Sequence, residues 1–120
     1  MQPSGYYLTV ETRKPVPREA YPTVAGSMVT AMHTLLGDRE RLCILLKAQI
    51  TDPRVEVEVT PYTVAEDATQ VSVVLHAVVQ AVPVEGTLCF DKAKLSTWLK
   101  QELDFPVNVS KRSVPVEVYD

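Results

Sequence analysis

Valine dominates this sequence and constrains its fold more than any other feature. Twenty of the 120 residues are valine, and many stand in alternating or nearly continuous runs, such as residues 55–59 and 71–82. A β-branched side chain has little freedom at its first torsion and packs well on a pleated surface, so it favours strands. We therefore expect a chain built around a β-sheet, a feature that says little about its chemistry.

The size and composition predict one globular domain that covers residues 1–120. Hydrophobic residues make up 46% of the chain and charged residues 22%, as is usual for a soluble protein. A net charge of -3 and scattered basic residues argue against a nucleic-acid partner. The longest apolar stretch, Val71–Val84, contains His76 and Gln80, and no export signal is found. We expect a soluble, cytoplasmic protein with no membrane partner.

Two segments have the apolar spacing of amphipathic helices. The first begins near Thr23, and Gly37 is expected to end it in a left-handed conformation. Asp91 is a suitable N-cap for the second helix, which Pro106 prevents from continuing. The apolar stripes comprise Val24, Met28, Met32, Leu35 and Leu36 in the first helix and Leu95, Trp98, Leu99 and Leu103 in the second.

The segment Arg39–Ile50 admits two interpretations. Its composition and leucine spacing favour a helix. If Thr51–Arg54 is a turn, the same segment can instead pair with residues 55–59 as a hairpin. That register places apolar pairs on one face and Lys47 opposite Glu58 on the other. Because one register satisfies both faces, we favour the hairpin.

The clearest strand is Thr69–Val82, which is apolar on both faces. Strands with two apolar faces are either central in a sheet or contribute to an interface. One face carries Val71, Val73, Leu75, Ala77, Val79 and Ala81, and the other carries Val74, Val78 and Val82.

Strands are also expected at both ends of the chain. Tyr6–Thr12 predicts a first strand, and only one of Tyr6 and Tyr7 can face the core because neighbouring residues point to opposite faces. Val107–Ser110 and Ser113–Val118 predict a terminal hairpin with Lys111 and Arg112 at its tip. The predicted fold class is therefore α+β, a mainly antiparallel sheet of about six or seven strands packed with two helices.

The sequence contains no arrangement of residues that is typical of catalysis, of a cofactor or of a metal. Cys43 and Cys89 each lie between apolar residues and are expected to be buried free thiols. The two histidines and two separated cysteines lack zinc-ligand spacing, and the four glycines form no phosphate-binding loop. His33 is expected to be a partly exposed structural residue. We predict no catalytic residue, no cofactor and no metal.

Two groups of polar residues could each form a site. Ser72, His76 and Gln80 are spaced by four residues on one strand face and could line a site for a small molecule or a hydrolytic reaction. Glu56 and Glu58 share another strand face, near Asp52 and Glu66-Asp67, and could bind a hard cation or act as acid and base. Solvated or partner-facing surfaces explain both groups more simply.

The favoured hypothesis is a non-enzymatic structural or interaction subunit of an assembly, with another protein or copies of itself as the partner. A viral or phage particle component, located in the virion, is one instance of this class. The alternative is a small-molecule-binding or hydrolytic domain with its site around His76. The predicted interface residues are Val74, His76, Val78, Val82, Val107, Val109, Val114, Val116 and Tyr119.

Overall fold

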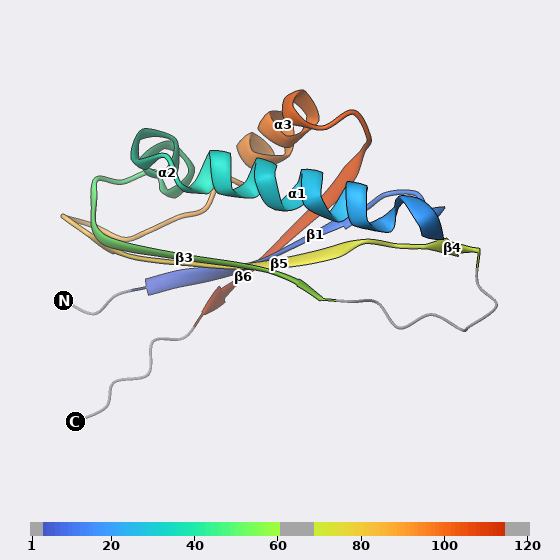
Figure 1. Ribbon diagram of the computed structural model, residues 1–120. Coiled ribbons are helices and arrows are strands. Elements are labelled where there is room, and N and C mark those ends of the chain that lie inside the picture. The colour runs from blue at the N-terminus through green and yellow to red at the C-terminus, as the bar shows by residue number, and fades with distance from the viewer. Residues whose placement is uncertain (1–3, 61–68, 115–120) are drawn as a thin grey trace.

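In the computed structural model, three helices lie over one face of a four-stranded sheet (Figure 1). The structure describes residues 4–60 and 69–114. The main sheet contains β1 (Ser4–Thr12), β3 (Ile50–Thr60), β5 (Val74–Pro83) and β6 (Val107–Val114). The helices are α1 (Tyr21–Leu36), α2 (Arg39–Leu46) and α3 (Lys92–Glu102). A 3-10 turn (Arg18–Ala20) and a two-stranded pair, β2 (Val16–Pro17) with β4 (Gln70–Val71), complete the fold. The predicted α+β class is confirmed.

The four strands lie in the order β3-β5-β1-β6, and every neighbouring pair is antiparallel. Along the chain the main elements run strand, helices, strand, strand, helix, strand, which is the ferredoxin-like split βαβ arrangement. This topology places β5 and β1 in the centre of the sheet and β3 and β6 at its edges.

The valine-rich strand β5 has two different faces, as its alternation predicts. Leu75, Ala77 and Val79 are buried with the helices, whereas the residues between them are only partly buried. β1 adds Leu8 and Val10 to the same core. The strand ends at Pro83, as expected for a residue that cannot donate to the sheet ladder.

Helices α1 and α3 follow their predicted stripes. Met28, Met32, Leu35 and Leu36 are buried in α1, which starts at Tyr21, two residues earlier than expected. The side chain of Asp91 caps α3 by accepting a hydrogen bond from the Lys94 amide at 2.9 Å. In α3, the buried residues are Leu95 and Leu99.

Two predictions about the next segment are wrong. Gly37 does not end α1 in a left-handed conformation, because its φ is −79°. Arg39–Leu46 is helix α2 and not a hairpin strand. Asp38 caps this helix by accepting from the Glu40 amide at 3.0 Å, and Lys47 ends it with a φ of 56°.

Tertiary packing explains why the helix prevails over the hairpin. The helical spacing puts Leu42, Leu45 and Leu46 in the core together, each with an exposed fraction of 2% or less. β3 then pairs with the longer apolar partner β5 and not with Arg39–Ile50. The expected turn Thr51–Arg54 lies inside β3 as an irregularity in the register, where Asp52 has a φ of 50°. The pairing of Lys47 with Glu58 is therefore not formed.

The predicted terminal hairpin is also wrong. Residues 107–114 form one strand, β6, which pairs along its length with β1 at the far end of the sequence. Lys111 and Arg112 lie within this strand and not in a turn. Eight residues of β1 pair with residues of β6. This pairing forms more backbone hydrogen bonds than a short hairpin would. The predicted second strand is Ser113–Val118; its first two residues belong to β6, and residues 115–118 lie outside the described residues.

Two glycines provide a matched test of the packing. Gly26 lies on the exposed side of α1, and a Cβ there would meet nothing within 4 Å. Gly26→Ala should raise the free energy of unfolding by about 0.5–1 kcal/mol. In Gly5→Ala the Cβ would lie 2.5 Å from the Val79 carbonyl oxygen, so the variant should lose about 1–3 kcal/mol. Urea unfolding of both variants checks this, and shifts in the same direction would contradict it.

Tyr6 joins β1 to the segment before α3. Its hydroxyl donates to the Leu88 carbonyl oxygen at 3.1 Å. Burial, and secondly the nearby Cys89, raise the pKa of Tyr6 from its ordinary value of 10.0. The contribution of the neutral phenol to stability is therefore complete below about pH 10 and is lost as the pH rises through the folded-state pKa.

Tyr6→Phe should remove this part of the alkaline instability. We expect the variant to lose less free energy of unfolding than the wild type between about pH 9 and pH 11. Urea unfolding at a series of pH values measures the two curves. If the free energies of unfolding of the wild type and Tyr6→Phe fall in parallel across this pH range, Tyr6 is not the cause of the alkaline instability.

Candidate functional site

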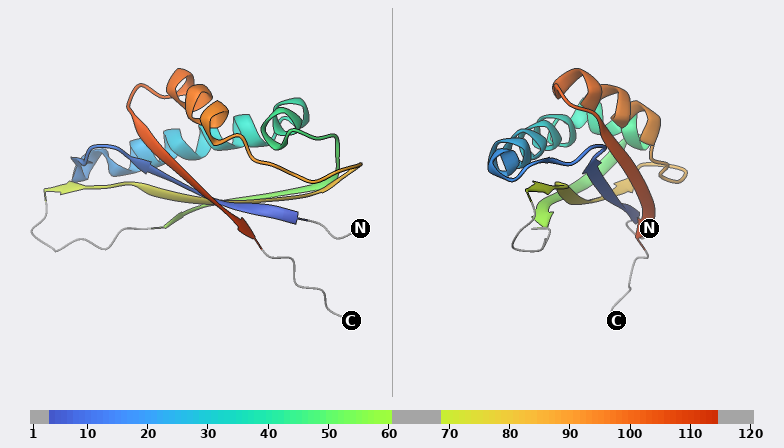
Figure 2. Two further views of the ribbon diagram at one scale, coloured as in Figure 1. Left: turned by 180° about the vertical axis from the view of Figure 1, so that it is seen from behind. Right: turned by 90° about the vertical axis from the view of Figure 1, so that its right-hand side faces the viewer.

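The face of the sheet opposite the helices is the main candidate surface. Both views in Figure 2 show the three helices on one side of the sheet, and no described helix on the other side. We call this second side the open face. Side chains alternate between the two faces along each strand, and residues paired directly across neighbouring strands lie on the same face. Every residue paired with a residue of the open face therefore also belongs to the open face.

Two rows of side chains cross the open face from β3 to β6. The first, which we call the Tyr7 row, is read from the register of the four strands and comprises Glu56, Val78, Tyr7 and Arg112. The second, the His76 row, comprises Glu58, His76, Thr9 and Ser110. Residues from four separate segments of the chain therefore come together on one surface.

Ring contacts connect the two rows. The Arg112 guanidinium carbon lies 4.6 Å from the centroid of the Tyr7 ring, within the range of cation–π attraction. The Tyr7 and His76 ring centroids are 5.2 Å apart. Thr9 Oγ1 and His76 Nδ1 form a hydrogen bond of 3.3 Å. These contacts hold Tyr7 and His76 against the sheet, so the centre of the open face is an ordered aromatic surface.

In the Tyr7 row and the His76 row, the charges are separated between the two edges of the sheet, and the open face also carries Arg54 on β3, in register with Gln80, and Glu11 on β1, in register with Val74. Glu56 and Glu58 lie on the edge strand β3, and Arg112 lies on the edge strand β6. Three strand spacings separate these edges, about 14 Å between backbones, which is too far for an ion pair within one molecule. The Tyr7 row therefore runs from a negative end, through Val78 and Tyr7, to a positive end.

The structure divides the predicted interface residues into three groups. Val74, His76, Val78 and Val82 lie on the open face, and Val114 lies there in register with Gly5. Val107 and Val109 lie on the other face: Val107 is buried and Val109 packs against the core. They pair with Thr12 and Val10 of β1, on the helix-covered side of the sheet. Val116 and Tyr119 lie outside the described residues.

The predicted interface residues include neither Tyr7 nor Arg112, which give the open face its aromatic centre and its positive end. Tyr7 carried a usable signal, since alternation requires one residue of the Tyr6-Tyr7 pair to face away from the core. Arg112 carried none, because it was assigned to a turn. Only the pairing of β6 with β1 places Arg112 beside Tyr7.

The alternative site is centred on His76, which lies on the open face. A hollow of about 290 Å³ at this part of the open face is lined by Tyr7, Val78, Arg112, Ser113 and Val114, and His76 is not among them. The imidazole lies against Tyr7 and Thr9 on a sheet surface. Ser72 precedes β5, so only Gln80 shares the strand with His76.

The structure corrects the prediction for the cysteines. Both thiols are free, but Cys43 is only partly buried and Cys89 is exposed. Cys89 lies in the segment between β5 and α3, where its apolar neighbours Leu88 and Phe90 enter the core and Cys89 points outward.

The remaining candidate groups do not assemble into a site. His33 is exposed on α1, rather than partly exposed as expected. Within residues 4–60 and 69–114, no three histidine, cysteine or acidic side chains gather as metal ligands. Glu66 and Asp67, proposed as neighbours of the strand acids, lie outside these ranges.

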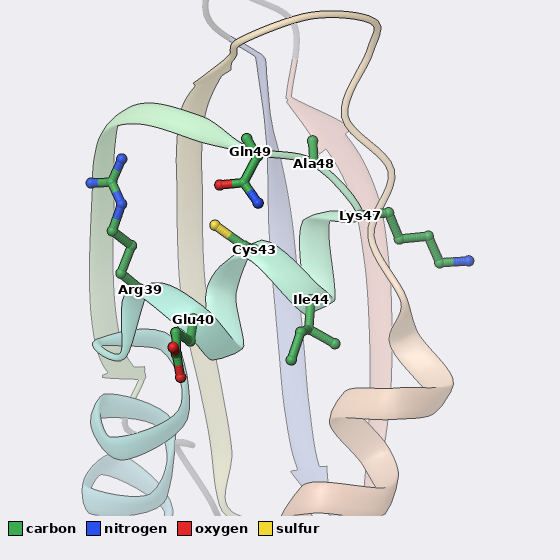
Figure 3. Close-up of a pocket in the computed structure, with 7 residues that line it drawn as sticks. All are labelled: Arg39, Glu40, Cys43, Ile44, Lys47, Ala48 and Gln49. Atoms are coloured by element: carbon green, nitrogen blue, oxygen red, sulfur yellow. The ribbon is translucent and has the colours of Figure 1, made fainter.

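A second surface hollow lies beside α2, with a volume of about 660 Å³ (Figure 3). Cys43 and Gln49 point into the space between the helix and the start of β3, whereas Ile44 and Lys47 point away from it. The hollow is lined by Arg39, Glu40, Cys43, Ile44, Lys47, Ala48 and Gln49. Among the described helices, none has the length and apolarity needed to cross a bilayer.

Comparisons with known proteins identify no relative that assigns a function. No family model and no curated protein matches the chain. Among solved structures, the chain is similar to one from methicillin-resistant Staphylococcus aureus named a "putative aminohydrolase", with a TM-score of 0.40 and 16% sequence identity. The match covers 93% of this chain but 29% of that protein. A likeness of this size supports no argument about activity.

Proposed function

We propose that this protein is a non-enzymatic interaction subunit whose open face packs against another protein surface. One observation carries the proposal: a central strand, β5, has one face enclosed under helices while Val74, Val78 and Val82 line the other, which no described helix covers. Burial of apolar side chains is the main driving force for protein association. A partner would remove these valines and Tyr7 from water.

The make-up of the open face supports binding better than catalysis. Aromatic and arginine side chains are enriched where proteins bind one another, and the open face supplies both, with Tyr7 on the central strand β1 and Arg112 beside it on the edge strand β6. The polar residues around them, among them Glu56, Glu58 and Ser110, resemble the rim of an interface. A subunit of a symmetric particle, viral or phage, fits this description, and so does a cytoplasmic complex; both locations remain predictions.

Association in solution tests the proposal. Sedimentation velocity and mass photometry over micromolar concentrations, on the protein alone and with candidate partners, should show a complex that protects Tyr7 from hydroxyl-radical labelling. Tyr21, on α1 and away from the open face, serves as the unprotected control. A protein that stays monomeric with every partner, and whose Tyr7 is always labelled, would overturn the proposal.

A further inference from the structure

We infer that the partner on the open face is a second copy of this chain, packed face to face about a two-fold axis that runs along the strands. The inference rests on the proposed function, because it names the occupant of the same surface. Its basis is the order of chemical groups in the Tyr7 row, which is negative, apolar, aromatic and positive from β3 to β6.

A two-fold axis along the strands exchanges the two edges of the sheet. The β3 edge of one copy then lies over the β6 edge of the other. Each Glu56 meets the partner's Arg112, and each Val78 meets the partner's Tyr7. The row is therefore complementary to itself, as the single patch of a two-fold dimer must be.

The other in-plane axis gives the opposite result. A two-fold axis across the strands leaves each edge over its own copy, so that Glu56 lies over Glu56 and Arg112 over Arg112. Like charges placed together at an interface oppose association, whereas complementary potentials favour it and fix its register. Within the Tyr7 row, charge therefore favours the axis along the strands.

The His76 row agrees with the selected axis. It places His76 over the partner's Thr9, and Glu58 over the partner's Ser110, so hydroxyl groups meet groups with which they form hydrogen bonds. Stacked sheets cross at about 30°, so matching is closest near the axis. The central strands β5 and β1 lie there, where Val78 and His76 meet the partner's Tyr7 and Thr9.

The size of the face predicts a dimer of moderate strength. Four strands about 4.8 Å apart, each about 8 residues long, present roughly 500 Å² per molecule in projection. Two copies would bury about 1,000 Å², close to the lower limit for a specific protein interface. Dimers should therefore be sought at micromolar and higher concentrations, and should weaken as added salt screens the edge charges.

A charge exchange on the full-length protein tests the geometry. Glu56→Arg and Arg112→Glu should each place like charges together at both ends of the dimer and raise its dissociation constant roughly tenfold or more. The variant that carries both changes restores opposite charges across the interface and should recover wild-type dimerisation. Glu102→Arg changes the net charge by the same amount as Glu56→Arg on α3, in the helical layer, and should leave dimerisation unchanged. Sedimentation equilibrium measures all five proteins.

Each result is informative, because circular dichroism and urea unfolding establish beforehand that the variants are folded. Weak single variants with a restored double variant support the two-fold arrangement. Single variants that dimerise normally, or a double variant that stays monomeric, overturn it. A wild type that is monomeric up to millimolar concentration also overturns it. If Tyr7 is nevertheless protected by a different protein, the proposed interaction function stands and only the choice of partner is wrong.

Discussion

Replacing Leu45 with alanine should lower the free energy of unfolding by about 2–5 kcal/mol, the cost of a cavity in a packed core. Leu45 is fully buried in α2, with an exposed fraction of 0%. The loss arises from side-chain packing alone, since the Leu45 carbonyl oxygen keeps its hydrogen bond from the Asp91 amide at 2.8 Å. Urea unfolding, with the slope compared between wild type and variant, measures the change.

The neighbouring Ile44 supplies a matched control that also tests the secondary structure. Its side chain is 50% exposed, so Ile44→Ala should change stability by no more than about 0.5 kcal/mol. In the hairpin interpretation the ranking is reversed, because Ile44 would share the apolar face with Leu46 while Leu45 joined Lys47 on the polar face. A larger loss for Ile44→Ala than for Leu45→Ala would therefore exclude the helix α2.

Replacing Val78 with glutamate should abolish association through the open face while the fold remains intact. Val78 lies between Glu56 and Tyr7 in the Tyr7 row, on the face that no described helix covers. In a complex, the new carboxylate would be buried without a partner and beside an existing negative charge. Such a group costs several kcal/mol, so the dissociation constant should rise by more than about a hundredfold.

Val84→Glu is the control for Val78→Glu. Val84 is 57% exposed and lies just beyond β5, so the same change in charge and volume falls outside the open face. The control should associate as the wild type does, and both variants should unfold within about 1 kcal/mol of it. Wild-type association by Val78→Glu would remove the open face from consideration, and unfolding of this variant would show that Val78 belongs to the core.

The parts of the fold that follow from local patterns were predicted correctly. The period-two pattern of β5 gave both faces of the strand, because neighbouring side chains in any strand must point in opposite directions. The cap at Asp91 and the stripe of α3 were equally visible, since a helix forms its hydrogen bonds within one segment. Each of these features depends on residues fewer than about twelve apart.

The wrong predictions concern segments whose local sequence is compatible with two structures, and contacts with residues distant in the chain determine which one forms. Arg39–Ile50 suits a helix and a strand, and only the availability of β5 as a partner for β3 decides between them. The sequence predicts β6 as half of a hairpin, because its true partner, β1, lies about a hundred residues earlier. The same error put Arg112 in a turn and removed it from the candidate surface.

The sequence by itself determined that this chain forms a valine-rich antiparallel sheet with helices, and that one central strand carries apolar side chains on both faces. Backbone hydrogen bonding and side-chain alternation act locally, so these properties are set by neighbouring residues. Only the tertiary structure decided which face the helices cover and which side chains meet on the other. Glu56, Val78, Tyr7 and Arg112 come from four strands far apart in the chain, and their common row exists only because strand pairing fixes their register.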